Sequence, residues 1–516
     1  MTKAPPTELR RSVTTWGSYA WGYADVGADI YVALGVVIGI AAGAANVAFA
    51  FAGLVYVCIG LAYTELSSAY PVAGGGQFFA MRALGDFIGF VAGWAVLLDF
   101  TIDIALFAWF TIGYISFLIP WLGDHKPVYF ACVLLVTAFL TVLNSMGVKQ
   151  SSRLNELVSA LDVVTETVIL VCAFLLAWDP KILVHTMQTA WPSTDDLLKG
   201  ISLAIISFVG LESISHAAEE TRRPTTVIPR TSVALILTIL IFALAYSNLV
   251  LGMHPVHTAH GGLVPMYQYI GSGDNNDKAI AVLASQIPYL GFIFALYVPL
   301  VGALLVLISS NSGVFGASRI AYSMAKFNVL PSWFQVTNPK TRTPIGTIVV
   351  FSGIAAIELC AAYLQGPHAI GFLADLYAFG AALSYTLVFI ALITLRFSDS
   401  IAPRRFKMPW NIPMTVFGKK GDVSILAVIG TLGIFAILIF TLLTHPIGRI
   451  AGPMWVLFGI AFYAVYRRGK HLPVFGSVKR NWVKLHEATL VAAGEIEMLD
   501  EYDVAVKAQN KAQAGG

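Results

Sequence analysis

The sequence predicts an all-α polytopic membrane protein with 12 transmembrane helices. Its 516 residues are 57% hydrophobic and 12% charged, with a mean hydropathy of +0.75, which is too apolar for an ordinary soluble protein. Apolar runs of about 20 residues, the length that crosses a bilayer, fill almost the whole chain. Basic and non-basic loops alternate between these runs, as they do in a polytopic protein of fixed orientation.

The expected spans follow from these runs. Their approximate bounds are 18–41, 45–66, 84–118, 128–146, 155–178, 199–219, 231–252, 284–312, 344–364, 369–396, 423–444 and 452–467. If both termini are cytoplasmic, only five of the 32 lysines and arginines fall outside, namely Lys126, Lys181, Lys199, Lys278 and Arg449. We therefore expect an integral protein of the plasma membrane with both termini in the cytoplasm.

The chain divides into one membrane domain and two polar ends. We expect a cytoplasmic N-terminal segment at 1–17, a transporter domain at 18–467 and a cytoplasmic tail at 468–516. Within the domain, 18–396 is the core and 423–467 holds the last two helices. No cleavable signal peptide is expected, because the first 11 residues are polar and the first apolar run has span length.

The first span carries two carboxylates. Asp25 and Asp29 lie four residues apart in the run WGYADVGADIYVALGVVIG (21–39), on one face of a continuous helix. An acid within a bilayer is costly unless it faces protein, water or a cation. Gly22 and Gly27 favour a break that would expose backbone ligands, a feature of transporters. The alternative is a continuous helix whose glycines allow close packing with its neighbours and whose acids lie near the membrane surface.

Further acids lie in the other spans. They are Asp99, Asp103, Asp162, Glu166, Glu212, Glu358 and Asp375. No lysine or arginine occupies the middle of the first seven spans, so these acids must be protonated, matched by a mobile cation or near water. This pattern predicts proton or cation coupling at Asp25, Asp99, Asp103, Asp162 and Glu212. Glu358 and Asp375 could equally lie near span ends.

The sixth span has a possible second break. Gly210 precedes Glu212 in SFVGLESISHAAEE (207–220), and Pro224 and Pro229 shape the segment that follows. His216, one turn after Glu212, could relay a proton or be an ordinary buried histidine.

Three connections and the cysteines carry weaker signals. Residues 71–84 could fold back toward the core or form a flexible turn. The basic loop with Arg404, Arg405, Lys407, Lys419 and Lys420 is an anchor on the cytoplasmic face or a weaker lipid-headgroup site. The run HPVHTAH (254–260) contains His254, His257 and His260 in a loop rich in proline and glycine. The four cysteines do not have the spacing of a metal-binding motif. We expect neither metal nor cofactor.

Four ordered motifs resemble the amino acid, polyamine and organocation (APC) superfamily. They are LAYTELSSAYPVAGGGQFFAMRALG (61–85), FVGLESISHAAEETRRPTTVIPR (208–230), ASRIAYSMAKFNVLPSWF with TRTPIG (317–346) and RRFKMPWNIP (404–413). The resemblance covers residues 15 to 470. It implies a LeuT-like core, in which helices 1 to 5 and 6 to 10 form inverted repeats with helices 1 and 6 broken, plus two extra helices.

The resemblance also implies binding residues. The break in helix 1, at Gly27, Ala28 and Asp29, would receive a substrate carboxylate on its amides. The break in helix 6 would receive an amine on its carbonyls, at Ser207, Phe208, Val209 and Gly210. Glu212 stands where some exchangers carry a proton-sensing glutamate.

Two departures from the family pattern favour cations. Asp29 replaces the last glycine of the usual G-x-G and would repel a carboxylate, while Asp162 stands near a position where sodium-independent members carry lysine. The stretch YADVGADIYVAL also resembles the first helix of Kup-type potassium transporters.

The leading hypothesis is a secondary active permease for an amino acid or related amine, working by alternating access and coupled to protons. The alternative is a transporter of a monovalent cation such as potassium, or of a polyamine. An enzyme is disfavoured, because no nucleophile elbow, P-loop or paired metal motif occurs. Expected partners are the small-molecule substrate, protons or another coupling ion, and membrane lipids, with no nucleic acid. The sequence leaves the oligomeric state open.

Overall fold

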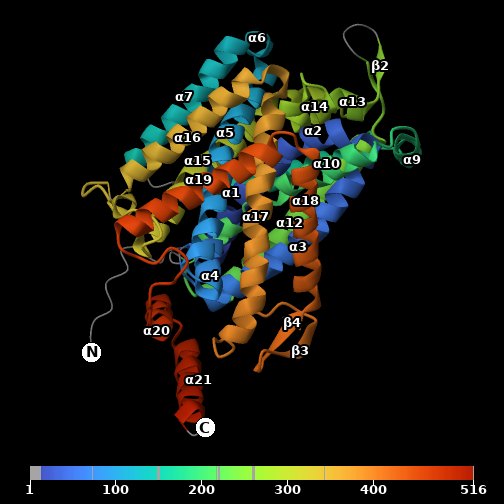
Figure 1. Cartoon of the computed structure of the whole chain (residues 1–516). Helices are drawn as coiled ribbons and strands as arrows, with labels where there is room; N and C mark the ends of the chain where they lie inside the picture. Colours follow the sequence, from blue (N-terminus) through green and yellow to red (C-terminus); the bar gives the residue numbers. More distant parts are fainter. Residues whose placement is uncertain are drawn as a thin grey trace.

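A computed structural model describes residues 13–72, 74–147, 152–216, 218, 221–257, 262–341 and 343–514. Helices form most of this part of the chain (Figure 1). The long helices are α3 (Ala45–Ala69), α5 (Asp86–Leu118), α7 (Lys126–Ser145), α8 (Ser152–Leu176), α12 (Pro224–Gly252), α15 (Gly291–Lys326), α16 (Ile345–Leu364), α17 (Ala369–Ser398), α18 (Ile425–Thr444) and α19 (Gly448–Gly469).

Shorter elements connect and interrupt them. The short helices are α1 (Thr15–Val26), α2 (Asp29–Ala41), α4 (Gly75–Leu84), α6 (Pro120–Asp124), α9 (Pro180–Thr189), α10 (Thr194–Ala204), α11 (Glu212–His216), α13 (Met266–Gly271), α14 (Ala279–Ser285), α20 (Trp482–Ala493) and α21 (Ile496–Ala514). Single 3-10 turns are η1 (Ala42–Ala44), η2 (Ile205–Phe208), η3 (Asn276–Lys278), η4 (Ser332–Gln335) and η5 (Gly366–His368).

Among the described residues, 11 helical runs are long and apolar enough to cross a membrane. The first of them, Thr15–Ala69, is 55 residues long and contains both of the first two expected spans. Ala42, with φ 42° and ψ −123°, interrupts its regular geometry between α2 and α3. The count is therefore one lower than the 12 expected, because two apolar stretches are separated by a single 3-10 turn and no polar loop.

The centre of the bundle is α5, whose apolar residues are almost all buried. It packs chiefly against α15 and α17, while α1 packs between α12 and α8, and α2 packs against α10. By contrast most residues of α7, α16, α18 and α19 are not buried inside the protein, as expected of lipid-facing helices. Of these, α7 and α16 lie along the upper left edge of the bundle in Figure 1.

Several expected bounds were wrong. The eighth span, expected at 284–312, is helix α15 at Gly291–Lys326, preceded by the short α14. The helix continues because its apolar residues after 312, such as Ala317, Ile320 and Ala321, are buried in one cluster with residues of α5. The seventh begins at Pro224, whose missing N–H is tolerated in a first turn.

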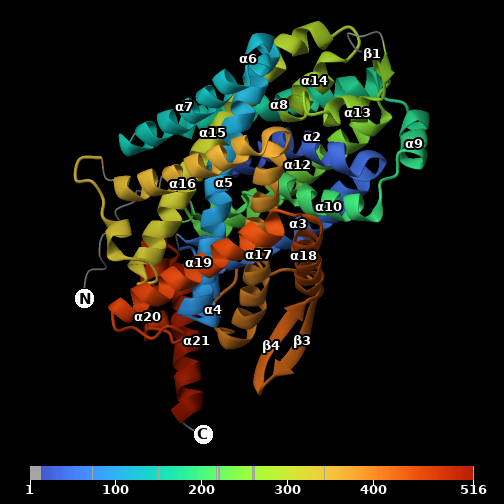
Figure 2. The ribbon, with the colours of Figure 1, turned by 45° about the horizontal axis from the view of Figure 1, so that its top comes forward.

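The connection at 71–84 and the chain end are also structured. Residues 75–84 form α4, which is largely buried and packs on α5 and α17, so the fold-back alternative is confirmed. The tail forms α20 and α21. The fold is not purely helical, because β1 (Val256–His257) pairs with β2 (Leu263–Val264), and β3 (Asn411–Val416) pairs with β4 (Lys419–Ser424). Figure 2 shows the second hairpin projecting beyond α17 and α18.

Candidate substrate and coupling site

The first helix is interrupted between α1 and α2, but only slightly. Gly27 and Ala28 keep right-handed helical dihedral angles, and the Gly27 amide donates to the Tyr23 carbonyl at 2.7 Å. The Ala28 amide reaches the Asp25 carbonyl at 3.3 Å. The expectation that the chain leaves helical geometry here was therefore too strong, because local hydrogen bonds already satisfy these two amides.

The sixth helix is broken completely. After α10 the chain tightens into η2, Val209 is extended, and Gly210 has a φ of +99° before α11 begins. Only glycine adopts this conformation without strain. Ser207, Phe208 and Val209 are buried, and the hydroxyl of Ser207 has no hydrogen-bond partner.

The two interruptions lie against each other. A Cβ atom added at Gly210 would lie 3.0 Å from the Val26 amide nitrogen and 3.1 Å from the Asp25 carboxyl carbon. Ser213 Oγ donates to Asp25 Oδ2 at 2.7 Å and also contacts the Gly210 carbonyl. The end of α1 and the break after α10 are therefore one site.

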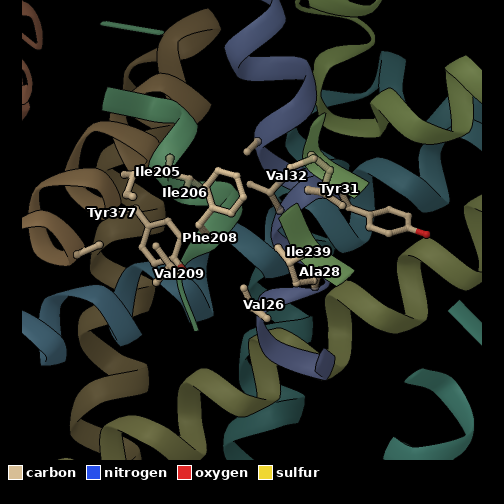
Figure 3. Close-up of a cluster of buried hydrophobic side chains, with 14 of the residues drawn as sticks. Val26, Ala28, Tyr31, Val32, Ile205, Ile206, Phe208, Val209, Ile239 and Tyr377 are labelled. Atoms are coloured by element: carbon tan, nitrogen blue, oxygen red, sulfur yellow. The ribbon is translucent and has the colours of Figure 1, made fainter. Parts of the chain in front are cut away.

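Apolar side chains fill the space on one side of this site. Phe208 and Val209 belong to one buried cluster with residues of the first break, and Phe208 stacks on Tyr56 with ring centres 4.9 Å apart. Figure 3 shows Phe208 and Val209 near Val32 and Tyr377 in this cluster.

Five of the predicted acids gather at the site, and we call them the five-acid cluster: Asp25, Asp29, Asp99, Asp103 and Glu212. Asp29 interacts electrostatically with the other four, and all five are buried. Tyr385 donates to Glu212 Oε2 at 2.8 Å, and Tyr377 lies 3.5 Å from Asp103 Oδ1. Among the described residues, none of the five pairs with a lysine or arginine.

Three carboxyl oxygens of this cluster are buried without a hydrogen-bond partner. They are Asp29 Oδ2, Asp99 Oδ1 and Asp103 Oδ2. A buried acceptor without a donor is costly, so such oxygens favour a proton, a cation or an ammonium group. This arrangement can hold positive charge more readily than negative charge.

Asp162, the remaining predicted coupling acid, lies in a different cluster. It shares α8 with Glu166, and Tyr23 donates to Asp162 Oδ2 at 2.8 Å and to Glu166 at 3.2 Å. Tyr31 donates to Asp162 Oδ1 at 2.6 Å. These hydrogen bonds tie α8 to α1 and α2.

The remaining acids of the spans have local partners. Glu358 accepts from Thr101 at 3.0 Å, and Asp375 Oδ1 lies 2.6 Å from His445 Nδ1, whose Nε2 lies 2.6 Å from Ser202 Oγ. Both lie outside the five-acid cluster.

Sequence reasoning missed the partners of these acids. Tyr23, Tyr31, Tyr377, Tyr385 and Ser213 are separated from the acids they contact by more than 130 residues. Tyrosine and serine are common in such spans, so no local signal separated these from ordinary packing residues.

Two predictions involve residues outside the described part. The side chain of His216 is not among those described, and His260 lies outside the described residues, so the proton relay and the histidine run are untested. His254 and His257 lie beside and within β1.

Comparison with known proteins decides the family. A family model described as amino acid permease matches residues 14–466. The chain belongs to the amino acid permease family. This confirms the resemblance to the APC superfamily and identifies an integral membrane protein that is a transporter, not an enzyme.

The relatives in this family carry several substrate descriptions. Branched-chain amino acid permease BcaP of Bacillus subtilis is 24% identical over 465 residues, covering 87% of this chain and 90% of the relative. Cationic amino acid transporter 4, vacuolar, of Arabidopsis thaliana is 26% identical over 422 residues, covering 76% and 64%. Cationic amino acid transporter 4 of Mus musculus is 27% identical over 416 residues, covering 77% and 61%. This chain therefore spans less than two thirds of those two cationic transporters.

Proposed function

We propose that this permease is a secondary active transporter for an amino acid or related amine, working by alternating access with proton coupling. The observation that carries the proposal is the contact between Gly210 and Asp25, which places two interrupted helices and the five-acid cluster together inside the bundle. Many transporters bind substrate and coupling ion at an interior site formed by interrupted helices.

The proposed fold and topology follow the family. The 55-residue run would be two spans, which restores 12 helices and a LeuT-like arrangement of two inverted repeats with two further helices. The excess of lysine and arginine in one set of loops supports cytoplasmic termini in the plasma membrane.

The proposed substrate contacts are the side chain of Asp29 at the first break and the backbone and side chains of the second break. The substrate would lie between Gly27, Ala28 and Asp29 on one side and Ser207 to Gly210 on the other. Its ammonium group would bind Asp29 Oδ2, which has no hydrogen-bond partner among the described residues, because an acid there attracts an amine and repels a carboxylate. Glu212 and Asp162 are proposed proton carriers.

A monovalent cation or polyamine is the second candidate. The three unpartnered carboxyl oxygens favour it, since they match a substrate that is only positively charged.

Reconstituted protein tests these alternatives. We would measure uptake of labelled amino acids, polyamines, potassium and sodium into proteoliposomes, with and without an inward proton gradient. Accumulation of a zwitterionic or cationic amino acid driven by the gradient supports the proposal. Potassium or a polyamine as the sole transported substrate would replace it with the second candidate, and amino acid uptake that ignores the gradient would remove proton coupling.

A further inference from the structure

The β3–β4 hairpin exposes apolar side chains on its outer strand. Trp410 is 65% exposed, Ile412 and Met414 are about half exposed, and Phe417 at the tip is fully exposed. All residues of β3 from Asn411 to Thr415 are exposed. A soluble surface seldom gathers such side chains without a partner.

The residues of the turn at the tip are unfavourable for the backbone conformation of that turn. Val416 pairs with Lys419, so Phe417 and Gly418 form a two-residue turn, with φ values of 49° and 77°. Turns with two positive φ values favour Asn-Gly, because a bulky residue in this conformation is strained. The backbone of Phe417 is therefore strained, and its exposed side chain has no aromatic or core contact with another described residue to offset that cost. This points to a contact outside the chain.

The inner strand holds the hairpin in a fixed orientation. Asp422 pairs with Arg396 at 3.0 Å and with Lys407, and Arg396 also donates to Asn411. Gly421 lies where a Cβ atom would be 2.6 Å from the Phe397 ring of α17. The exposed edge is thus presented by a structured element and not by a loose loop.

Charge and position identify the partner. Lys419 and Lys420 follow the turn, are exposed, and have no ion pair among the described residues. Helix α18 begins at the residue after β4, and its first turns expose Ile425, Val428 and Ile429 as a lipid-facing span does. Aromatic residues beside lysines at the end of a span are typical of a membrane interface, where lysine interacts with anionic headgroups.

We propose that the β3–β4 hairpin binds anionic phospholipids, with Lys419 and Lys420 at the headgroups and Phe417 inserted into the interface of the same leaflet. This site is independent of the transport proposal, since it lies outside the substrate region and its test measures no transport. Figures 1 and 2 show the hairpin at the ends of α17 and α18, clear of the other helices.

A depth measurement tests the insertion. Phe417→Cys, in a background where Cys58, Cys132, Cys172 and Cys360 are replaced by alanine, would carry a nitroxide spin label in nanodiscs of phosphatidylcholine with or without phosphatidylglycerol. We expect the label to be more accessible to oxygen than to a water-soluble nickel complex when phosphatidylglycerol is present. A label that stays fully aqueous in both lipids overturns the proposal and would favour a protein partner for this edge.

Matched variants test the lysines and the turn. Lys419→Gln with Lys420→Gln should lower phosphatidylglycerol affinity, measured by native mass spectrometry, by about tenfold or more. Lys479→Gln with Lys484→Gln, which changes the same charge in the exposed tail, should leave it unchanged. Phe417→Asn should improve the turn and preserve thermal stability in detergent, yet lose the lipid insertion. The proposal is contradicted if the two lysine-pair variants have equal affinity for phosphatidylglycerol. It is also contradicted if a spin label at Ile412→Cys, combined with Phe417→Asn in the same cysteine-free background, is still more accessible to oxygen than to the nickel complex.

Discussion

The hydroxyl of Ser213 donates a 2.7 Å hydrogen bond to Asp25, and this contact joins the break of the sixth helix to the end of α1. Residues 188 positions apart in the chain thereby form one buried polar site. Each helix end depends on the other for a partner, since the bilayer supplies no water to replace it.

Ser213→Ala removes the donor and leaves Asp25 with an unsatisfied oxygen. Loss of a partner to a buried acceptor costs about 1–3 kcal/mol, so we expect a lower thermal midpoint and reduced substrate affinity. Ser247→Ala is the control, because Ser247 is equally buried but donates only to the Leu244 carbonyl in its own helix. If both variants bind substrate alike, the Ser213 contact does not shape the site.

Gly210→Ala places a methyl group against α1. Its positive φ alone costs about 1–2 kcal/mol for a side chain, and the new Cβ would lie 3.0 Å from the Val26 nitrogen. We expect the two breaks to separate and uptake to fall at least tenfold, measured in proteoliposomes at equal protein density. Gly353→Ala, where no atom lies within 4 Å, should transport normally. Normal uptake by the Gly210 variant would show that the close approach is dispensable.

Glu212→Gln keeps the size of the side chain and its contact with Tyr385 but cannot exchange a proton. If Glu212 couples protons, the variant should still exchange substrate across the membrane, while uptake no longer responds to the proton gradient. Glu358→Gln serves as a control, because Glu358 is bonded to Thr101 outside the five-acid cluster. An unchanged gradient dependence in Glu212→Gln would assign coupling to another acid.

The docking of the tail should weaken in acid. His486 of α20 lies between Tyr70 and Tyr502, with ring centres 5.5 and 4.5 Å away. Burial, with smaller effects from Arg82 and Arg404, lowers its pKa from 6.5 to about 4, against the opposing effect of Asp399. The docked tail therefore prefers neutral histidine. Its stability is fully present above pH 6.5 and is lost as the pH falls toward 4, by roughly 3 kcal/mol at most.

Hydrogen exchange of α20 and α21 between pH 7 and 4, corrected for intrinsic rates, would measure this effect. His486→Gln should flatten the pH dependence, while His471→Gln, at an exposed position, should retain it. A profile unaffected by the His486 substitution would mean that other groups control docking.

The candidate site was predicted in part. Asp25 and Glu212 were identified from their own spans, because a carboxylate in an apolar run is conspicuous wherever it folds. Their partners were not, since Ser213 and Tyr385 resemble ordinary packing residues until distant helices are placed together. The first break was overestimated, because the helix is interrupted at Gly27 and Ala28 but these two residues keep right-handed helical dihedral angles.

The sequence by itself determined a polytopic membrane protein, most of its spans and the acids within them, because hydrophobic length and isolated charge are local properties. Only the tertiary structure decided which acids meet. It gathered Asp25, Asp29, Asp99, Asp103 and Glu212 at the two breaks and put Asp162 with Tyr23 and Tyr31 elsewhere. The reason is that the rotation of each helix about its axis is set by packing against non-adjacent helices, and span hydropathy does not encode that rotation.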